Sequence, residues 1–201
     1  SRNLNPLDPA VLTIGKIEAG TARNVIAGEA KIEGTARTFS KQAQEMIEAG
    51  ADKVIVIEDP MLAEYVTEPY TKALTALIKE YDPNIVLFGA SSIGRDLAPR
   101  VAARIHTGLT ADCTHLDIDM EKYFEFLHAT STADTDAIAK KLGMDDKTLK
   151  MTRPAFGGNV MATIRCADYR PQMATVRPGV MKLAEAQPGK QGEVEDFKVE
   201  L

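Results

Sequence analysis

Two apolar runs, each followed by a helical pattern, constrain the fold of this chain more than any other feature. KVIVIE (53–58) and NIVLFGA (84–90) are rich in β-branched and other apolar residues. Continuous apolar runs of this length are typical of strands buried on both faces of a sheet. Residues 67–81, with Thr67 as the expected N-cap, and residues 91–105 repeat apolar side chains at helical spacing. This alternation predicts an α/β fold with a mostly parallel sheet flanked by helices, a three-layer, nucleotide-binding-like arrangement.

The first forty residues follow a different pattern. Apolar and polar residues alternate through VLTIGKIEAG and again through EAKIEGTART, which predicts an antiparallel β-hairpin at the N-terminus. We therefore divide the chain into a hairpin segment (1–40), a domain of strands and helices (41–182) and a charged linker or tail (183–201). Residues 120–150 are polar and helix-prone, and we expect them to leave the core of that domain.

Composition limits the function classes. The chain of 201 residues is 44% hydrophobic and 26% charged, with a net charge of −5 and a pI of about 5.3. An acidic chain is a poor partner for nucleic acid, and no apolar run is long enough to span a membrane. Because no secretory signal pattern is present, we expect a cytoplasmic protein with Cys113 and Cys166 as reduced thiols, and a disulfide stays open as the alternative. The histidine and cysteine spacings fit no metal site.

The segment TRPAFGG (152–158) is an unusual entrance to a predicted strand. Pro154 restricts Arg153 to extended backbone conformations, and Gly157 with Gly158 allows another molecule to approach the backbone. Two interpretations follow from these residues. The segment is either a loop that faces a ligand, or a bulge whose Arg153 makes a structural salt bridge.

The segment GASSIGRDLAPR (89–100) follows a predicted strand and opens a predicted helix. Glycines at a helix N-terminus suit an anion, and Ser91, Gly94 and Arg95 are the candidate contacts. The pattern is not GxGxxG, and no P-loop lysine follows. The alternative is a strand-to-helix turn in which glycine permits close packing.

Other positions are interpreted as structural. Arg170 and Arg177 are expected to make contacts at a domain junction, and Met161, Met173 and Met181 are expected to fill the core. We find no Ser-His-Asp or Cys-His arrangement and no acid and base pair, so no independent catalysis is predicted.

Residues 41–182 resemble the N-terminal domain of the electron transfer flavoprotein alpha subunit. The resemblance rests on EAGADKVIVIEDP, FGASSIGRDLAPRVAARIHTGLTADCTHLDID, MTRPAFGGNVMATI and RPQMATVRPGVMK, in this order. It implies one subunit of an FAD-carrying heterodimer, whose other subunit is an electron transfer flavoprotein beta subunit. The implied function is electron transfer between NADH or flavin and an acyl-CoA dehydrogenase-type enzyme. The TRPAFGG form is similar to that of anaerobic fermentative bacteria, which implies flavin-based electron bifurcation.

The same resemblance assigns roles to the two loops. It implies that one loop faces a flavin held mainly by the beta subunit. The residues of this loop are Arg153, Phe156, Gly157 and Gly158. A guanidinium beside a flavin ring would stabilise an anionic reduced flavin and tune its potential. It also implies that the other loop lies near the subunit interface, with the residues Ser91, Gly94 and Arg95.

Residues 1–40 instead resemble the lid or dimerisation domain of the zinc-dependent aminoacylase and hippurate-hydrolase amidohydrolases, through the turn GTARNVIAG. We therefore expect a chimera in which a foreign hairpin precedes an alpha-subunit core, without the usual FAD domain. This predicts that FAD belongs to the parent heterodimer and is not bound by the chain alone. The alternative is a recombined or engineered, non-catalytic domain that only folds or self-associates, as a homodimer through the hairpin.

Overall fold

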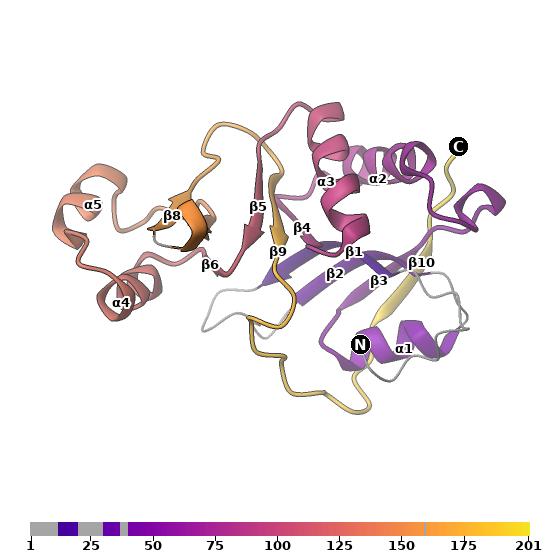
Figure 1. The fold of residues 1–201 in the computed structure, drawn as a ribbon. Coiled ribbons are helices and arrows are strands. Elements are labelled where there is room, and N and C mark those ends of the chain that lie inside the picture. Colours follow the sequence, from indigo (N-terminus) through magenta and orange to yellow (C-terminus); the bar gives the residue numbers. More distant parts are fainter. Residues whose placement is uncertain (1–11, 20–29, 37–39, 159) are drawn as a thin grey trace.

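The computed structural model describes residues 12–19, 30–36, 40–158 and 160–201, in which strands and helices alternate (Figure 1). The strands are β1 (Leu12–Ala19), β2 (Ala30–Ala36), β3 (Lys53–Val56), β4 (Ile85–Gly89), β5 (Leu109–Cys113), β6 (His115–Asp117), β7 (Lys150–Ala155), β8 (Val160–Ile164), β9 (Gln172–Val176) and β10 (Glu193–Asp196). The α-helices are α1 (Ser40–Glu48), α2 (Thr67–Tyr81), α3 (Ser92–Arg104), α4 (Met120–Thr130) and α5 (Thr135–Leu142). Two short 3-10 turns are η1 (Pro60–Leu62) and η2 (Phe156–Gly158).

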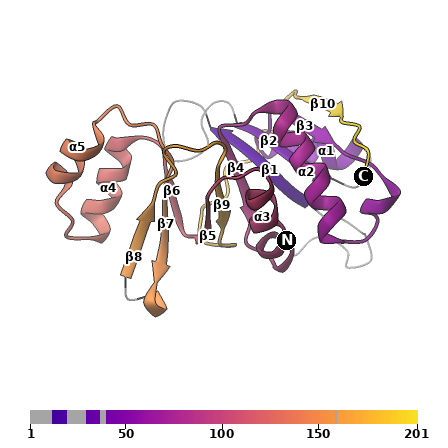
Figure 2. The same ribbon diagram turned by 90° about the horizontal axis from the view of Figure 1, so that it is seen from above.

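Parallel pairing dominates the core, as the apolar runs predict. β9 pairs with β4 on one side and β5 on the other, and β3 pairs with β10, all in parallel. The antiparallel hairpin of β1 and β2 lies between these groups, with β1 alongside β4 and β2 alongside β3 (Figures 1 and 2). The predicted α/β class and N-terminal hairpin are therefore confirmed. The turn that carries the amidohydrolase resemblance lies outside the described residues.

Helices cover both faces of the core strands. α2 and α3 lie on one face and α1 on the other (Figure 1). Leu74 of α2 and Leu97 of α3 are buried against Phe88 of β4, in one apolar cluster. On the opposite face, Ile47 of α1 packs with Val54 of β3. Each buried aliphatic side chain of this kind contributes roughly 1.5–3 kcal/mol, so the two clusters hold the layers together.

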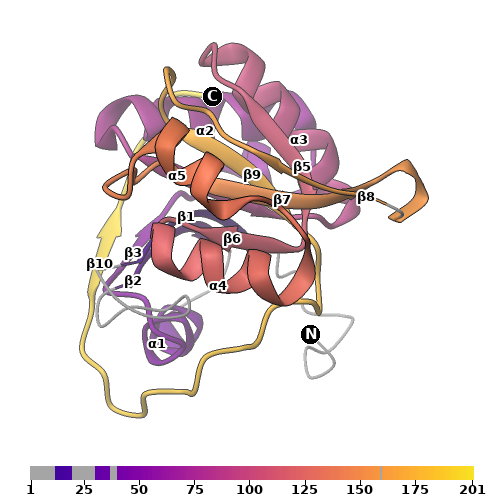
Figure 3. The same cartoon turned by 90° about the vertical axis from the view of Figure 1, so that its left-hand side faces the viewer.

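A smaller unit projects from the side of this core. It consists of the antiparallel sheet β6–β7–β8 with α4 and α5 (Figures 1 and 3), and it contains the predicted excursion of residues 120–150. Lys150 is fully buried at its base, where the Nζ donates to the carbonyl oxygens of Ile118 and Asp146, both at 2.8 Å. The Nζ also lies 3.0 Å from the Asp146 carboxylate. These contacts satisfy a buried charge and fix the start of β7.

Two expectations are corrected. Thr67 is the first residue of α2, not its N-cap, because Val66 occupies the cap position and the Thr67 hydroxyl donates to Asp96 instead. Residues 193–196 of the expected linker or tail form β10, which adds a parallel edge strand to β3. Lys53 contributes to this pairing through ion pairs with Glu193 and Glu195.

Candidate functional site

The candidate site lies at the carboxyl ends of β4, β9 and β5, where chain segments distant in sequence converge. The backbone N–H of Ala90, after β4, donates to the carbonyl of Val176 at the end of β9 at 2.8 Å. Arg177 then donates its N–H to the carbonyl of Cys113 at the end of β5, also at 2.8 Å. The carboxyl edge of parallel strands is the usual place for binding groups in α/β folds.

The loop from β4 into α3 is shaped by Ser91 and Gly94. Ser91 is the N-cap, and its Oγ accepts a hydrogen bond from the Gly94 N–H at 3.2 Å. A Cβ on Gly94 would lie only 1.9 Å from the carbonyl oxygen of Gly89, so the helix start packs directly against the strand end. Arg95 is anchored by a hydrogen bond from its Nε to the Ala90 carbonyl at 2.9 Å.

Asp112 lies at the centre of the site. Its carboxylate accepts two hydrogen bonds from Arg177, Nε at 3.1 Å and Nη2 at 2.5 Å, and lies 3.4 Å from the Nη2 of Arg95. The hydrogen bonds from Arg177 hold the pKa of Asp112 below its usual range, against a smaller opposing effect of burial. The charges of Arg177, Arg95 and Arg153 add to this lowering, so Asp112 stays ionised.

The backbone of Asp112 adopts a left-handed conformation, with a φ of 63°. Its N–H donates to the hydroxyl of the buried Thr175 at 2.7 Å. Left-handed backbone is tolerated best by glycine, asparagine and aspartate, so the conformation agrees with the residue that occupies it. The strand end therefore turns at this point and presents the carboxylate to the arginines.

Arg153 reaches the same region from β7. The neighbouring Thr152 accepts the Thr114 N–H at 2.9 Å, which fixes β7 beside the end of β5. The Nε of Arg153 is buried without a hydrogen-bond partner among the described residues, and in those ranges Arg153 has no ion pair. The predicted alternative of a structural salt bridge is thus not supported in the described part of the chain.

The remainder of the TRPAFGG segment forms the tip of an arm made by β7 and β8 (Figure 3). Phe156 is 83% exposed, and its φ of 48° is followed by φ values of 68° at Gly157 and 92° at Gly158. Val160 and Met161 of β8 are also exposed, so Met161 does not fill the core as expected. The arm therefore carries apolar side chains in a position where its own chain does not cover them.

The structure thus brings together only part of the predicted set. Three of the predicted residues lie at the carboxyl edge of the sheet, namely Ser91, Gly94 and Arg95. The charge of Arg153 acts on Asp112 at the same edge. By contrast, the residues from Phe156 to Gly158 lie at the tip of the arm. Sequence reasoning missed Asp112 and interpreted Arg177 as a junction contact, although both are central to the cluster. Within the sequence, no spacing pattern connects two residues that stand 65 positions apart.

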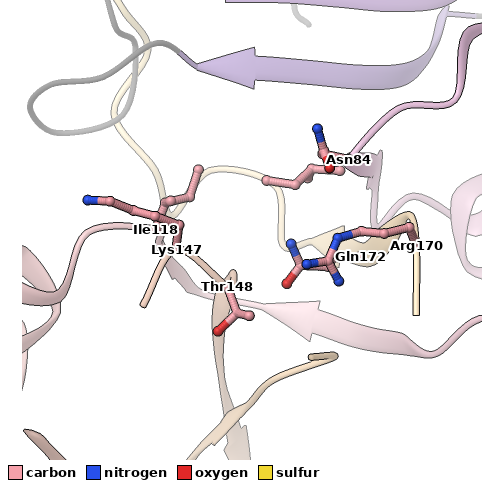
Figure 4. A pocket seen from close by; sticks show the side chains of 7 residues that line it. Asn84, Ile118, Lys147, Thr148, Arg170 and Gln172 are labelled. Carbon is pink, nitrogen blue, oxygen red and sulfur yellow. The ribbon is translucent and has the colours of Figure 1, made fainter. Parts of the chain in front are cut away.

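A cavity of about 450 Å³ lies at the opposite, amino ends of β4 and β9 (Figure 4). Its lining residues are Asn84, Ile85, Ile118, Lys147, Thr148, Arg170 and Gln172. None of the predicted site residues is among them. The buried Gln172 accepts the Leu149 N–H through its Oε1 at 2.8 Å, which ties the smaller unit to the core at this place.

Two other kinds of site have no counterpart in the described part of the chain. No group of three or more histidine, cysteine, aspartate or glutamate side chains in those ranges could hold a metal ion. Likewise, none of the helices among the described residues has the length and apolar character needed to cross a membrane. Cys113 and Cys166 are both free thiols, as predicted.

Comparison with known proteins gives one consistent family. The electron transfer flavoprotein domain matches residues 4–201, a range that includes the hairpin expected to be foreign. The acryloyl-CoA reductase electron transfer subunit beta of Anaerotignum propionicum is 58% identical over 143 residues, which cover 71% of this chain and 38% of that protein.

Two electron transfer flavoprotein alpha subunits are also similar. That of Thermoanaerobacterium thermosaccharolyticum is 47% identical over 159 residues, covering 79% of this chain and 41% of the relative. That of Megasphaera elsdenii is 46% identical over 159 residues, covering 79% and 40%. The chain therefore spans about two fifths of the length of these relatives.

Proposed function

Because this chain belongs to the electron transfer flavoprotein family, we propose that it acts in electron transfer as the flavin-facing part of an alpha subunit. In this proposal the flavin is FAD, held mainly by a beta subunit in a heterodimer. The electrons pass between NADH or flavin and an acyl-CoA dehydrogenase-type enzyme by flavin-based bifurcation. The name of the Anaerotignum relative, an acryloyl-CoA reductase electron transfer subunit, supports this class of partner.

The observation that carries the proposal is the surplus of positive charge around Arg153. Arg177 and Arg95 contact the carboxylate of Asp112, and Arg177 already binds both of its oxygens. The charge of Arg153 acts on the same carboxylate. Arg153 keeps a buried Nε with no partner among the described residues. A buried N–H without a partner is costly unless an acceptor completes it, and an anionic reduced flavin would offer an acceptor with the required charge. A bound flavin would supply the redox chemistry, and Arg153 would stabilise its reduced form.

The exposed arm supports the proposal of a beta-subunit partner. Phe156 at its tip and Val160 and Met161 along β8 offer exposed apolar contact area on the arm that carries Arg153. Exposed aromatic and methionine side chains are enriched at the centres of protein interfaces. We assign to this arm the contact with the beta subunit, while Ser91, Gly94 and Arg95 lie at the neighbouring edge of the interface.

The proposal is tested by replacing Arg153→Gln in the complex reconstituted with its beta subunit and FAD. We expect a lower midpoint potential of the flavin, because the reduced anion loses a stabilising positive charge. Arg104→Gln is the matched control, since Arg104 lies at the other end of α3 and pairs with Glu68 at 2.7 Å. Equal potentials for Arg153→Gln and the wild type would contradict the proposed role of this residue.

FAD binding by the chain alone is not part of the proposal. The arginines and Asp112 lie at one edge of the sheet and the apolar side chains lie on the arm, so together they offer a charge and a contact surface to a flavin held elsewhere. We expect the purified chain to show no stoichiometric flavin absorbance. A yellow chain that retains FAD through gel filtration would contradict this.

We also propose a separate origin for residues 1–40. The support is that β1 and β2 form the antiparallel pair inside an otherwise parallel row of core strands. The alternative of a homodimer through this hairpin is less consistent with its position, because β3 and β4 flank both of its edges. Sedimentation of the chain alone tests the homodimer, since a homodimer built on the hairpin requires a free edge.

A further inference from the structure

The carboxylate of Asp112 stands at the centre of the arginine cluster, and nothing in the resemblance or in the relatives assigns it a role. Arg177 donates to both of its oxygens, and Arg95 lies 3.4 Å away. The charge of Arg153 also acts on it. Among the described residues, Asp112 is therefore the negative charge that all three arginines share.

We propose that Asp112 is a positioning residue and counter-charge that sets how strongly Arg153 stabilises an anion at this edge. By binding Arg177 through two hydrogen bonds, Asp112 holds that guanidinium group in place and cancels one positive charge. Arg153 then remains as the group that meets the anion, since its Nε has no partner among the described residues. This inference rests on the proposed function of Arg153.

Two structural features support a fixed negative charge at this position. The left-handed backbone of Asp112, at a φ of 63°, and its hydrogen bond to Thr175 hold the carboxylate toward the arginines. Because its pKa is lowered, mainly by the hydrogen bonds from Arg177, the carboxylate remains charged at neutral pH. The net charge of the cluster is therefore set by the protein rather than by the solution.

The sign of the effect separates a counter-charge from a structural role. Removing the positive charge of Arg153 destabilises an anion, whereas removing the negative charge of Asp112 stabilises it. Local damage to the site would weaken the stabilisation of an anion in both variants. Asp112→Asn is suited to this test, because asparagine tolerates a positive φ and its amide oxygen can still accept from Arg177.

The experiment measures the midpoint potential of the flavin in the complex reconstituted with FAD and the beta subunit. We expect Arg153→Gln to lower this potential and Asp112→Asn to raise it. Asp119→Asn is the matched control, because Asp119 pairs with Lys147 at 3.2 Å on the smaller unit. A lower or unchanged potential in Asp112→Asn, with the decrease in Arg153→Gln intact, overturns this inference alone. An unchanged potential in Arg153→Gln overturns the proposed function beneath it.

A second readout needs no flavin. Sulfate serves as an anion probe for the full chain without its partner, with affinity measured by calorimetry. We expect Asp112→Asn to bind sulfate about threefold more tightly than the wild type, the order of effect of one charge at a hydrated surface. Arg153→Gln is expected to bind it more weakly. Weaker sulfate binding in Asp112→Asn than in the wild type would count against the counter-charge.

Discussion

Replacing Gly94→Ala tests whether the start of α3 is held against the end of β4 as closely as described. A Cβ at this position would lie 1.9 Å from the carbonyl oxygen of Gly89 and 3.1 Å from its carbonyl carbon. The obstacle is backbone rather than a flexible side chain, so α3 and β4 must separate by more than about 1 Å in a close-packed region.

The expected loss of stability follows from two opposing contributions. Overpacking of a well-packed site costs about 1–3 kcal/mol, and a backbone obstacle favours the upper end. Exchanging glycine for alanine inside a helix returns about 0.8 kcal/mol. We therefore expect the free energy of unfolding to fall by about 2 kcal/mol, with Arg95 displaced from the Ala90 carbonyl.

Urea unfolding followed by far-ultraviolet circular dichroism measures this loss as a lower midpoint at unchanged m-value. Gly89→Ala is the matched control, because a Cβ there meets nothing within 4 Å. We expect this control to stay within about 0.5 kcal/mol of the wild type. If Gly94→Ala is as stable as Gly89→Ala, the close approach of helix and strand is wrong.

Two further predictions concern ionisable groups. Burial alone would raise the pKa of Asp146, but hydrogen bonds from Thr148 and Lys150 and the charges of Lys150 and Arg165 lower it from 3.8 to about 2. Its contribution to stability is therefore complete above about pH 4 and is lost as the pH falls toward 2. Asp146→Asn should flatten acid unfolding curves in that window, and an unchanged pH dependence would refute this. Burial raises the pKa of Cys113 to about 11, so the native chain should react with a disulfide reagent only at the half-buried Cys166. We expect one reactive thiol in the native wild type and none in native Cys166→Ser. A reactive thiol in native Cys166→Ser would contradict this.

Much of the fold could be predicted because its signals are local. Continuous apolar runs identified β3 and β4 as buried strands, and helical spacing identified α2 over the observed bounds. The predicted N-cap of α2 was wrong, because the Thr67 hydroxyl donates a hydrogen bond to Asp96. Asp96 belongs to α3, and no local sequence pattern reveals this partner. β10 was missed because an edge strand needs only one neighbour, and its glutamates resemble a solvated tail until Lys53 pairs with them.

The candidate site was only partly predictable for a related reason. Gly94 carries a local signal, because close packing of strand and helix at glycine was the stated alternative and is observed at this position. The N-cap role of Ser91 was not predicted. The partnership of Asp112 and Arg177 depends on the parallel alignment of β5 with β9, which sequence spacing does not encode. Met161 was expected in the core because an apolar strand residue has the same pattern whether its own chain or another covers it.

The pairing of β10 with β3 has a consequence for the order of folding. Glu193 lies opposite Lys53 across 140 positions of the chain, whereas β1 and β2, which pair with each other, are close together in the sequence. Long-range closures of this kind are slow, so the outer edge of β3 is among the last parts of the sheet to be covered. Until then its backbone N–H and C=O groups are open to another chain. Lys53, which pairs with the glutamates of β10 in the folded chain, places a positive charge on that edge while it is open, and charges of this kind oppose edge-to-edge pairing.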